Sequence, residues 1–165
     1  MQCLYPVQPV VGVGAVIIHN ESILLVRRGK EPAQGLWSIP GGAVELGEVL
    51  SEAVEREVRE ECGLKIQAGP VVAVLDSLTR DAKGQVAYHY VLVDFWAEVK
   101  GGKLRPSSDA KEASWVPLAK LPREKLTQGL IPLLEHLGCL NGTPPTKPPH
   151  SILYWSQAGQ IPGTR

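Results

Sequence analysis

The sequence lacks an excess of charge of either sign, because 17 lysine and arginine residues balance 17 aspartate and glutamate residues. A balanced chain does not offer the broad basic footprint that binding to nucleic acid or to an anionic membrane surface requires. No apolar run is long enough to span a bilayer, and there is no secretory signal. These absences predict a protein that acts apart from membranes and nucleic acid, while a local basic cluster could still bind one phosphorylated ligand.

Cysteine is scarce, and its three occurrences are far apart: Cys3, Cys62 and Cys139. They form no metal-binding spacing, and their odd number suggests no disulfide framework. We therefore expect reduced thiols and a cytoplasmic location. A length of 165 residues suits one domain with a sizeable core.

The most informative stretch begins with a loop and continues as a helix. Gly41 and Gly42 follow Pro40, which is a loop signal. From about Val49 the apolar residues recur with a helical period, and Gly63 stands where a C-terminal cap belongs. The sequence therefore predicts a loop that leads into a helix of about three turns.

Several carboxylates lie on the apolar side of this helix, which is expected to face the core. At about 100° per residue, Glu57 and Glu61 share the apolar face, and Glu60 lies close beside it. Buried carboxylates without a partner are costly, and carboxylates at such spacing repel each other. A hard divalent cation with oxygen ligands would remove both costs. On helix geometry alone, an amphipathic helix whose glutamates happen to cluster explains the pattern equally well.

The full spacing of this stretch adds a resemblance to a known family. It resembles the Nudix box at each defining position: Gly42, Glu48, Arg56, Glu57, Val58, Glu60, Glu61, Gly63 and Leu64. The resemblance is specific over these 23 residues, extends loosely over residues 10 to 137, and does not reach the C-terminal tail. It implies the Nudix fold, an α/β (α+β) arrangement with a mixed β-sheet sandwiched between helices, as in small MutT-like and ADP-ribose pyrophosphatase-like members.

The resemblance also implies an activity and the residues that perform it. Nudix hydrolases cleave a phosphoanhydride bond in a nucleoside diphosphate linked to another group, with Mg²⁺ or Mn²⁺ as cofactor. Carried over by position, Glu57, Glu60 and Glu61 would be metal ligands. In several family members the glutamate at the Glu57 position is also assigned as the base, and the sequence leaves open which acid has that role here. Arg56 would orient a neighbouring carboxylate, and Glu48 would support the loop or join the metal ligands.

Relatives often draw one more acidic residue from a loop before a strand that holds a tryptophan. Here the tryptophan is Trp115, and the candidate acids are Asp109 and Glu112. Asp109 is better placed by its spacing from Trp115. An ordinary solvated loop acid is the alternative for either residue.

Substrate contacts are expected on two sides of the loop. Arg27 and Arg28 end a predicted strand, and a basic residue at this place often holds phosphates in the family. Successive strand residues face opposite ways, so at most one of the two should face the site. Solvated arginines are the alternative. The loop glycines Gly41 and Gly42 complete the expected substrate-binding set.

The substrate itself is left open by the sequence. The proline that ADP-ribose-specific members often carry about fifteen residues after the box is absent from residues 77–80, and so is the extended motif of NADH-cleaving members. ADP-ribose-like compounds, nucleotide sugars and nucleoside triphosphates remain. A non-catalytic nucleotide-sensing module is the alternative function, although a sensor has no need to keep all three glutamates. Action on capped RNA is disfavoured by the neutral charge.

Periodicity and turn signals predict the remaining elements and three segments. We expect an N-terminal arm over 1–9, a catalytic domain over 10–140 and a proline-rich linker with a tail over 141–165. The expected elements are hairpin strands at 11–18 and 23–27, a second hairpin at 71–78 and 86–99, a short strand at 113–117 and a helix within 121–138 that Thr127 would cap.

The tail carries an apolar tetrapeptide, residues 152–155, behind a linker with four prolines. Apolar side chains on a semi-rigid tether are expected to dock. The surface would belong either to the same domain or to a second copy, which would make the protein a homodimer.

Overall fold

The structure is a computed structural model, and it describes residues 4–105 and 110–160 of the chain. The elements in chain order are β1 (Val10–Val16), β2 (Ile18–His19), β3 (Ser22–Arg28), β4 (Trp37–Ser38), β5 (Gly41–Ala43), α1 (Leu50–Cys62), β6 (Leu64–Arg80), β7 (Val86–Gly102), β8 (Ala110–Pro117), two 3₁₀ turns (Leu118–Lys120 and Arg123–Lys125), α2 (Leu130–His136) and β9 (Leu153–Gln160).

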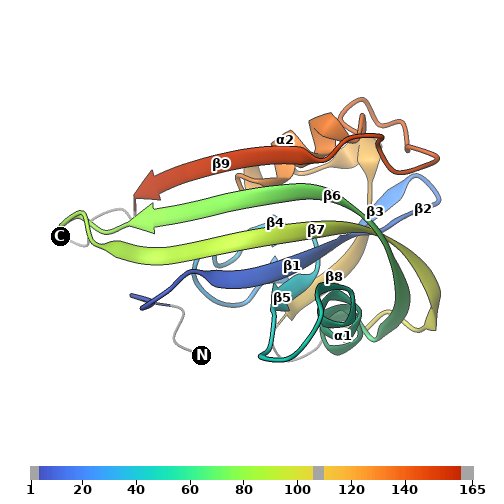
Figure 1. Ribbon diagram of the computed structural model, residues 1–165. Helices are drawn as coiled ribbons and strands as arrows, with labels where there is room; N and C mark the ends of the chain where they lie inside the picture. Colours follow the sequence, from blue (N-terminus) through green and yellow to red (C-terminus); the bar gives the residue numbers. More distant parts are fainter. Residues whose placement is uncertain (1–3, 106–109, 161–165) are drawn as a thin grey trace.

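Two sheets form the body of the molecule. Sheet A is mixed and has the strand order β5-β1-β7-β6-β9, while sheet B contains β2, β3 and β4 with β8 paired to β3. Helix α1 packs against one face of the arrangement and α2 lies on the other side, so the sheets are enclosed between helices (Figure 1). This is the mixed α/β architecture that the sequence predicts. Within the described ranges, no helix has the length and apolar character needed to cross a membrane.

The first predicted hairpin is only partly correct. The turn at Asn20 and Glu21 exists, with positive φ angles of 46° and 62°, as tight hairpin turns require. Only Ile18 and His19 pair with β3, however. Strand β1 pairs instead with β7 in parallel and with β5 in antiparallel fashion. The reason is burial: every residue of β1 except Val11 is buried, so the strand belongs inside a sheet and not in an exposed hairpin.

Helix α1 forms where the sequence predicts it. Gly63 ends the helix in the left-handed conformation with φ of 72°, and its N–H donates to the carbonyl of Arg59. No side chain caps the start, where Val49 stands. The helix buries Ala53, Val54, Val58 and Cys62, which anchor it on β1, β3 and β6. This anchoring sets the position of the neighbouring helix face, from which Glu57 lies against Gly42 and Glu61 accepts the N–H of Gly41.

The second hairpin is confirmed, but its first strand is longer than predicted. Strand β6 begins at Leu64 instead of residue 71 and pairs with β7 along nearly its full length. Pro70 falls where the register shifts between Ala68 and Val71. At a bulge, one residue does not need to donate a hydrogen bond to the neighbouring strand. Pro70, which has no backbone N–H, therefore does not end β6.

The prediction of one helix over 121–138 is wrong in its first half. Helix α2 begins only at Leu130, after Gly129, and Thr127 is not its cap. The backbone N–H of Thr127 donates to the carbonyl of Trp37 at 2.9 Å, which holds this segment on β4. The N–H of Thr127 is therefore used in a contact with another strand and not in a helix, and the helix begins three residues later. Pro132 sits in the first turn of α2, where proline is tolerated.

The expectation that the tail docks is confirmed, and the docking surface belongs to the same chain. Strand β9 adds to the edge of sheet A in parallel with β6, from the pair Ala73 and Leu153 onward (Figure 1). The linker before it is held by α2, because the ring of His136 bonds the carbonyl of Ser151 at 2.8 Å. The sheet edge thus receives a strand from beyond the proline-rich segment.

Candidate active site

The floor of the candidate site is strand β5, which lies directly on β1. Gly41 pairs with Gly14, and Gly42 pairs with Val13. A Cβ atom on Gly41 would overlap the carbonyl of Val13, and one on Gly42 would overlap the carboxylate of Glu57. Glycine is therefore required at both positions, because the backbone and a helix side chain approach each other too closely for any other residue.

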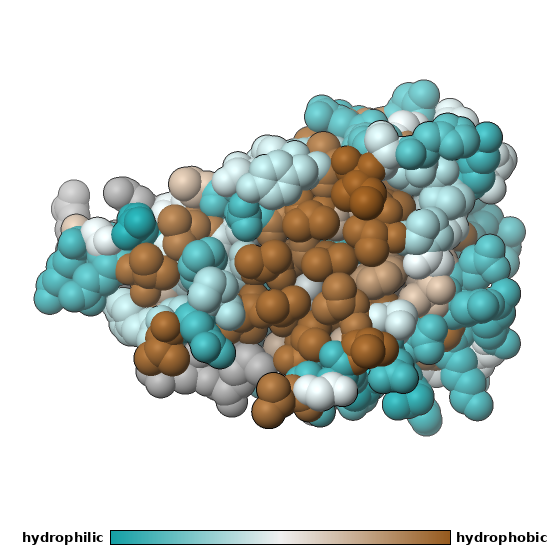
Figure 2. All heavy atoms as spheres, in the orientation of Figure 1, coloured by the Kyte–Doolittle hydropathy of each residue, from teal (hydrophilic) through white to brown (hydrophobic). Residues whose placement is uncertain are grey.

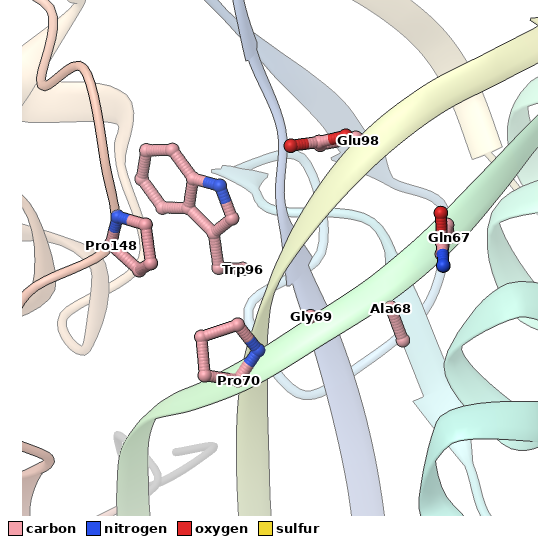
Figure 3. A pocket seen from close by; sticks show the side chains of 7 residues that line it. All are labelled: Gln67, Ala68, Gly69, Pro70, Trp96, Glu98 and Pro148. Atoms are coloured by element: carbon pink, nitrogen blue, oxygen red, sulfur yellow. The ribbon is translucent and has the colours of Figure 1, made fainter.

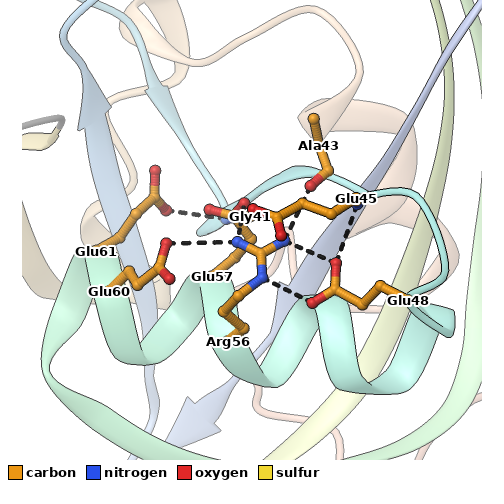
Figure 4. Close-up of polar contacts among 8 residues, drawn as sticks. All are labelled: Gly41, Ala43, Glu45, Glu48, Arg56, Glu57, Glu60 and Glu61. Atoms are coloured by element: carbon orange, nitrogen blue, oxygen red, sulfur yellow. Dashed lines mark hydrogen bonds and ion pairs between the residues drawn. The ribbon is translucent and has the colours of Figure 1, made fainter. Parts of the chain in front are cut away.

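Arg56 of α1 is the centre of the site (Figure 4). Its Nε and Nη2 atoms donate to the two carboxylate oxygens of Glu48 at 2.7 and 2.8 Å, which is a bidentate pair. Nη1 donates to Glu57 at 2.7 Å and lies 3.4 Å from Glu60. Nη2 also reaches the carbonyl of Ala43 at 3.1 Å. One guanidinium group therefore joins α1 to the loop that precedes it.

The two ends of the loop are held by carboxylates. Glu48 accepts the N–H of Glu45 at 3.1 Å in addition to the guanidinium of Arg56. Glu61 accepts the N–H of Gly41 at 3.0 Å. Glu61 of α1 thus holds the start of β5, and Glu48 holds the loop between β5 and α1, so the box residues share one small region of space.

The pKa values of the two carboxylates Glu48 and Glu57 are shifted in opposite directions. The hydrogen bonds from Arg56 lower the pKa of Glu48 to about 2, so this group is firmly ionised. Glu57 behaves in the opposite way, because its burial raises its pKa despite the neighbouring arginine. A carboxylate with a raised pKa holds a proton better than an exposed glutamate, which suits a general base.

The donor set agrees in kind with a divalent cation. Glu57, Glu60 and Glu61 offer only oxygen atoms, which hard cations prefer, and they lie along one side of α1 (Figure 4). Among the described residues, no three acidic, histidine or cysteine side chains converge as a ready-made metal group. Glu57 and Glu60 instead contact Arg56, while Glu61 accepts the N–H of Gly41. The assignment of these residues and Glu48 as metal ligands stays a prediction.

The two arginines of β3 brace the loop that follows them. Arg27 Nε donates to the carbonyl of Gly35 at 3.1 Å, and Arg28 Nε donates to the carbonyl of Pro32 at 2.7 Å. Arg27 also lies 3.6 Å from Glu112, its neighbour across the strands. Glu112 therefore stands on β8 as the exposed partner of an arginine. Asp109, the other predicted acid, lies outside the described residues.

Sequence reasoning did not single out Asp94, which lies beside the site. Asp94 pairs with Gly14, and Gly14 pairs with Gly41, so one strand separates this carboxyl group from the box loop. Burial raises its pKa to about 7. The available signal was a lone acid within the apolar run of residues 91–97. An acid in such a run is costly unless its surroundings use it.

Two pockets lie away from the box. One of about 330 Å³ is formed where the bulge of β6 meets the linker, between Trp96, Pro70 and Pro148 (Figure 3). The other, of about 550 Å³, includes Trp115 and His19. Neither is lined by a box glutamate, so the site is defined by the loop and the helix face.

Comparison with known proteins identifies the family. The NUDIX domain model matches residues 8–137. The chain therefore belongs to the NUDIX domain family.

Individual relatives agree with this assignment. The chain is 39% identical over 115 residues to an ADP-ribose pyrophosphatase of Methanocaldococcus jannaschii, a match that covers 70% of this chain and 66% of that protein. It is 30% identical over 121 residues to an 8-oxo-dGDP phosphatase of mouse (Mus musculus), covering 71% of this chain but 35% of the relative. A MutT NUDIX hydrolase from Burkholderia pseudomallei superposes with a TM-score of 0.65 at 34% identity, covering 78% of this chain and 97% of that structure. The match thus spans only part of the two curated relatives.

Proposed function

We propose that the protein is a pyrophosphohydrolase that cleaves a phosphoanhydride bond in a nucleoside diphosphate linked to another group. The observation that carries the proposal is the Arg56 network, which holds Glu48 ionised and places the half-buried Glu57 against Gly42. The names of the relatives support ADP-ribose or an oxidised guanine nucleotide as substrate. A nucleotide sugar or a nucleoside triphosphate would suit the same chemistry.

The reaction requires a nucleophile from water and neutralisation of phosphoryl charge. Glu57 would accept the proton of the attacking water, because its raised pKa favours protonation as the new P–O bond forms and the anhydride P–O bond breaks. Mg²⁺, or Mn²⁺ in its place, would neutralise charge on the phosphoryl oxygens when held by Glu57, Glu60 and Glu61. Gly41 and Gly42 would contact the diphosphate through their backbone.

The test is a panel of ADP-ribose, nucleotide sugars and nucleoside di- and triphosphates, each incubated with Mg²⁺ and analysed by product mass. We expect one class to give two phosphorylated products, and no turnover after removal of the metal by a chelator. Binding without turnover would support a nucleotide-sensing module instead. Retention of Glu57, Glu60 and Glu61 together favours the enzyme, since a sensor does not need all three.

We further propose that a second copy of the chain is a partner. The face of sheet A on the α1 side carries an apolar area that the elements of the described residues leave uncovered (Figure 2). We call it the valine patch, and it consists of Val11, Val74, Val91, Val93, Ile152 and Tyr154. An equal number of positive and negative residues does not oppose self-association. The cytoplasmic location expected from the reduced thiols stays a prediction.

A further inference from the structure

The larger of the two pockets, of about 550 Å³, lies where β2, β7 and β8 meet the segment that follows the C-terminal end of α1. We call it the Trp115 pocket. Its floor is apolar, because Leu64 belongs to the core under α1 and Leu104 packs against that core. Small-molecule sites are typically apolar cavities of about 300–1,000 Å³ with a few polar groups. The Trp115 pocket is therefore large enough for a ligand with two fused rings.

Two aromatic rings form one wall of the Trp115 pocket. The ring centroids of His19 and Trp115 are 5.9 Å apart, and the rings are tilted by 51°. A tilted pair forms a corner and does not cover its own faces, as a parallel stack would. Trp115 is partly buried and His19 is exposed, and both line the pocket. A flat aromatic ring in this corner would gain both face and edge contacts.

The charged side chains of the pocket leave one positive charge uncompensated. Glu98 is paired with Lys100, because Lys100 Nζ lies 2.9 Å from Glu98 Oε2. Lys103 lines the same pocket, and among the described residues its side chain has neither a hydrogen bond nor an ion pair. A single ammonium group balances a single carboxylate. A phosphate would bring about two negative charges close to Glu98, which Lys103 alone would not balance.

We propose that the Trp115 pocket is a second ligand site, separate from the box, which binds a flat aromatic ring that carries one carboxylate. The ring would lie in the corner of His19 and Trp115, and the carboxylate would face Lys103. The inference does not depend on the proposed hydrolysis, because it concerns a cavity that no box glutamate lines among the described residues.

The Trp115 pocket is connected to the box helix by residues 102–105. Arg105 N–H donates to the carbonyl of Cys62, the last residue of α1, at 2.8 Å. Gly102 has φ of 87°, and a Cβ atom there would lie 2.5 Å from the carbonyl oxygen of Gly63. The segment is therefore packed closely on the end of α1, where Cys62 directly follows Glu61. A ligand held between Lys103 and Trp115 would stabilise this end of the helix.

Calorimetry on the full chain compares indole-3-acetate with indole-3-acetamide, two probes that share a ring system and differ in charge. We expect indole-3-acetate to bind with a Kd of about 0.1 mM and the amide to bind about tenfold more weakly. Lys103→Met removes the charge and keeps an unbranched side chain. It should weaken indole-3-acetate about tenfold and change the Kd of the amide less than about twofold.

Lys65→Met is the matched control for this variant. Lys65 is an exposed lysine paired with Gly101 on β7, and it does not line the pocket. Both probes should bind to Lys65→Met within about twofold of wild type. The inference is wrong if the acid and the amide bind equally, if Lys103→Met behaves like Lys65→Met, or if neither probe binds at up to about 5 mM.

Two further variants distinguish the Trp115 pocket from the valine patch. Val99 lines the pocket, so Val99→Glu should weaken indole-3-acetate more than about tenfold by placing a second carboxylate there. Val11→Glu makes the same change on the valine patch and should leave the Kd within about twofold of wild type. The reverse order would place the probe on the valine patch and overturn the inference. In nuclear magnetic resonance spectra, the indole N–H signal of Trp115, identified with Trp115→Phe, should shift during the titration.

Hydrogen exchange tests the connection to α1. The amides of Gly63 and Arg105 donate to Arg59 and Cys62, so their exchange reports on the end of the helix. Indole-3-acetate at about ten times its Kd should slow both by up to about tenfold. The amide of Gly84, in the distant turn between β6 and β7, is the control and should exchange at an unchanged rate. Equal exchange at Gly63 and Arg105 with and without the probe would overturn the connection.

Discussion

At the scale of single residues, one guanidinium group organises the site. Arg56 is 16% exposed and contacts Glu48, Glu57 and Glu60 at once. A lysine could not replace it, because a single ammonium cannot make the bidentate pair with Glu48 while also reaching Glu57 and the carbonyl of Ala43. The network explains how Glu48 of the loop can lie close to Glu57 and Glu60 of α1, because all three carboxylates contact the same positive charge.

Glu61→Gln should abolish metal-dependent turnover and leave the fold intact. The amide keeps the shape and can still accept the N–H of Gly41, but it lacks the charge that a cation would need. We expect kcat to fall at least about a hundredfold, or ~2.7 kcal/mol. Steady-state kinetics and circular dichroism provide the readout, with Glu52→Gln on the solvent side of α1 as control. A kcat within about threefold of wild type would exclude Glu61 as a ligand.

Glu48 should make the stability of the fold depend on pH in the acidic range. Its folded pKa of about 2 lies below the ordinary value of 4.5, so the ionised form is favoured by folding. The contribution is present above the ordinary value and is lost as pH falls toward the folded one. The Tm of the wild type should fall between about pH 6 and pH 3. In Glu48→Gln we expect this fall to be smaller by about 3 °C, because the variant has no carboxylate to protonate. Calorimetric melting at both pH values tests this, and parallel curves for the two proteins would contradict it.

At the scale of elements, β9 is the part whose position depends most on the rest of the fold. It follows a proline-rich linker and, among the strands of the described residues, pairs only with β6. Its alternate residues serve two surfaces, since Tyr154 bonds Asp76 on the valine patch side and Trp155 faces α2. The strand therefore makes contacts on both faces of sheet A at its edge.

Removal of residues 141–165 should destabilise the domain without abolishing hydrolysis. The shortened chain loses the pairing of β9 and the burial of Leu153 and Trp155, worth roughly 1.5–3 kcal/mol for each side chain when fully buried. Because both are only partly buried, we expect Tm to fall by about 5 °C or more. Differential scanning fluorimetry measures the change, with Ser156→Ala as the control. Hydrolysis should persist, and an unchanged Tm would show that β9 adds nothing to stability.

At the scale of the whole molecule, apolar surface is distributed unevenly. Helix α1 covers only part of its face of sheet A, and the valine patch is left beside it (Figure 2). Val11 is 41% exposed and Tyr154 is 66% exposed within it. Contiguous apolar surface of this kind usually marks an interface.

The valine patch should therefore mediate self-association. We expect the wild type to show the mass of a dimer in light scattering at concentrations of about 10 to 100 μM, and Val11→Glu to be a monomer there. Val99→Glu is the matched control, because Val99 is 38% exposed on β7 but lies outside the patch. A wild type that stays monomeric over this range, or a dimer that Val11→Glu leaves intact, would place the interface elsewhere or exclude it.

The sequence by itself determined the box helix, its glycine cap and the hairpin of β6 and β7. Helical period, the left-handed preference of Gly63 and the turn between the strands are local effects, set by residues a few positions apart. The spacing of the glutamates predicted the candidate site for the same reason. The placement of Arg56 among them needed only α1 and the loop before it.

Only the tertiary structure decided the partners of β1, the shortened α2 and the docking of β9. The pairing of Gly14 with Asp94 joins residues 80 positions apart, as the register shows, and that of Leu75 with Trp155 joins residues equally distant. Such contacts depend on which surfaces remain uncovered after the local elements have formed, and no periodicity records that. Asp94 and Trp155 therefore came into view as parts of one face only once the strands of sheet A were in order.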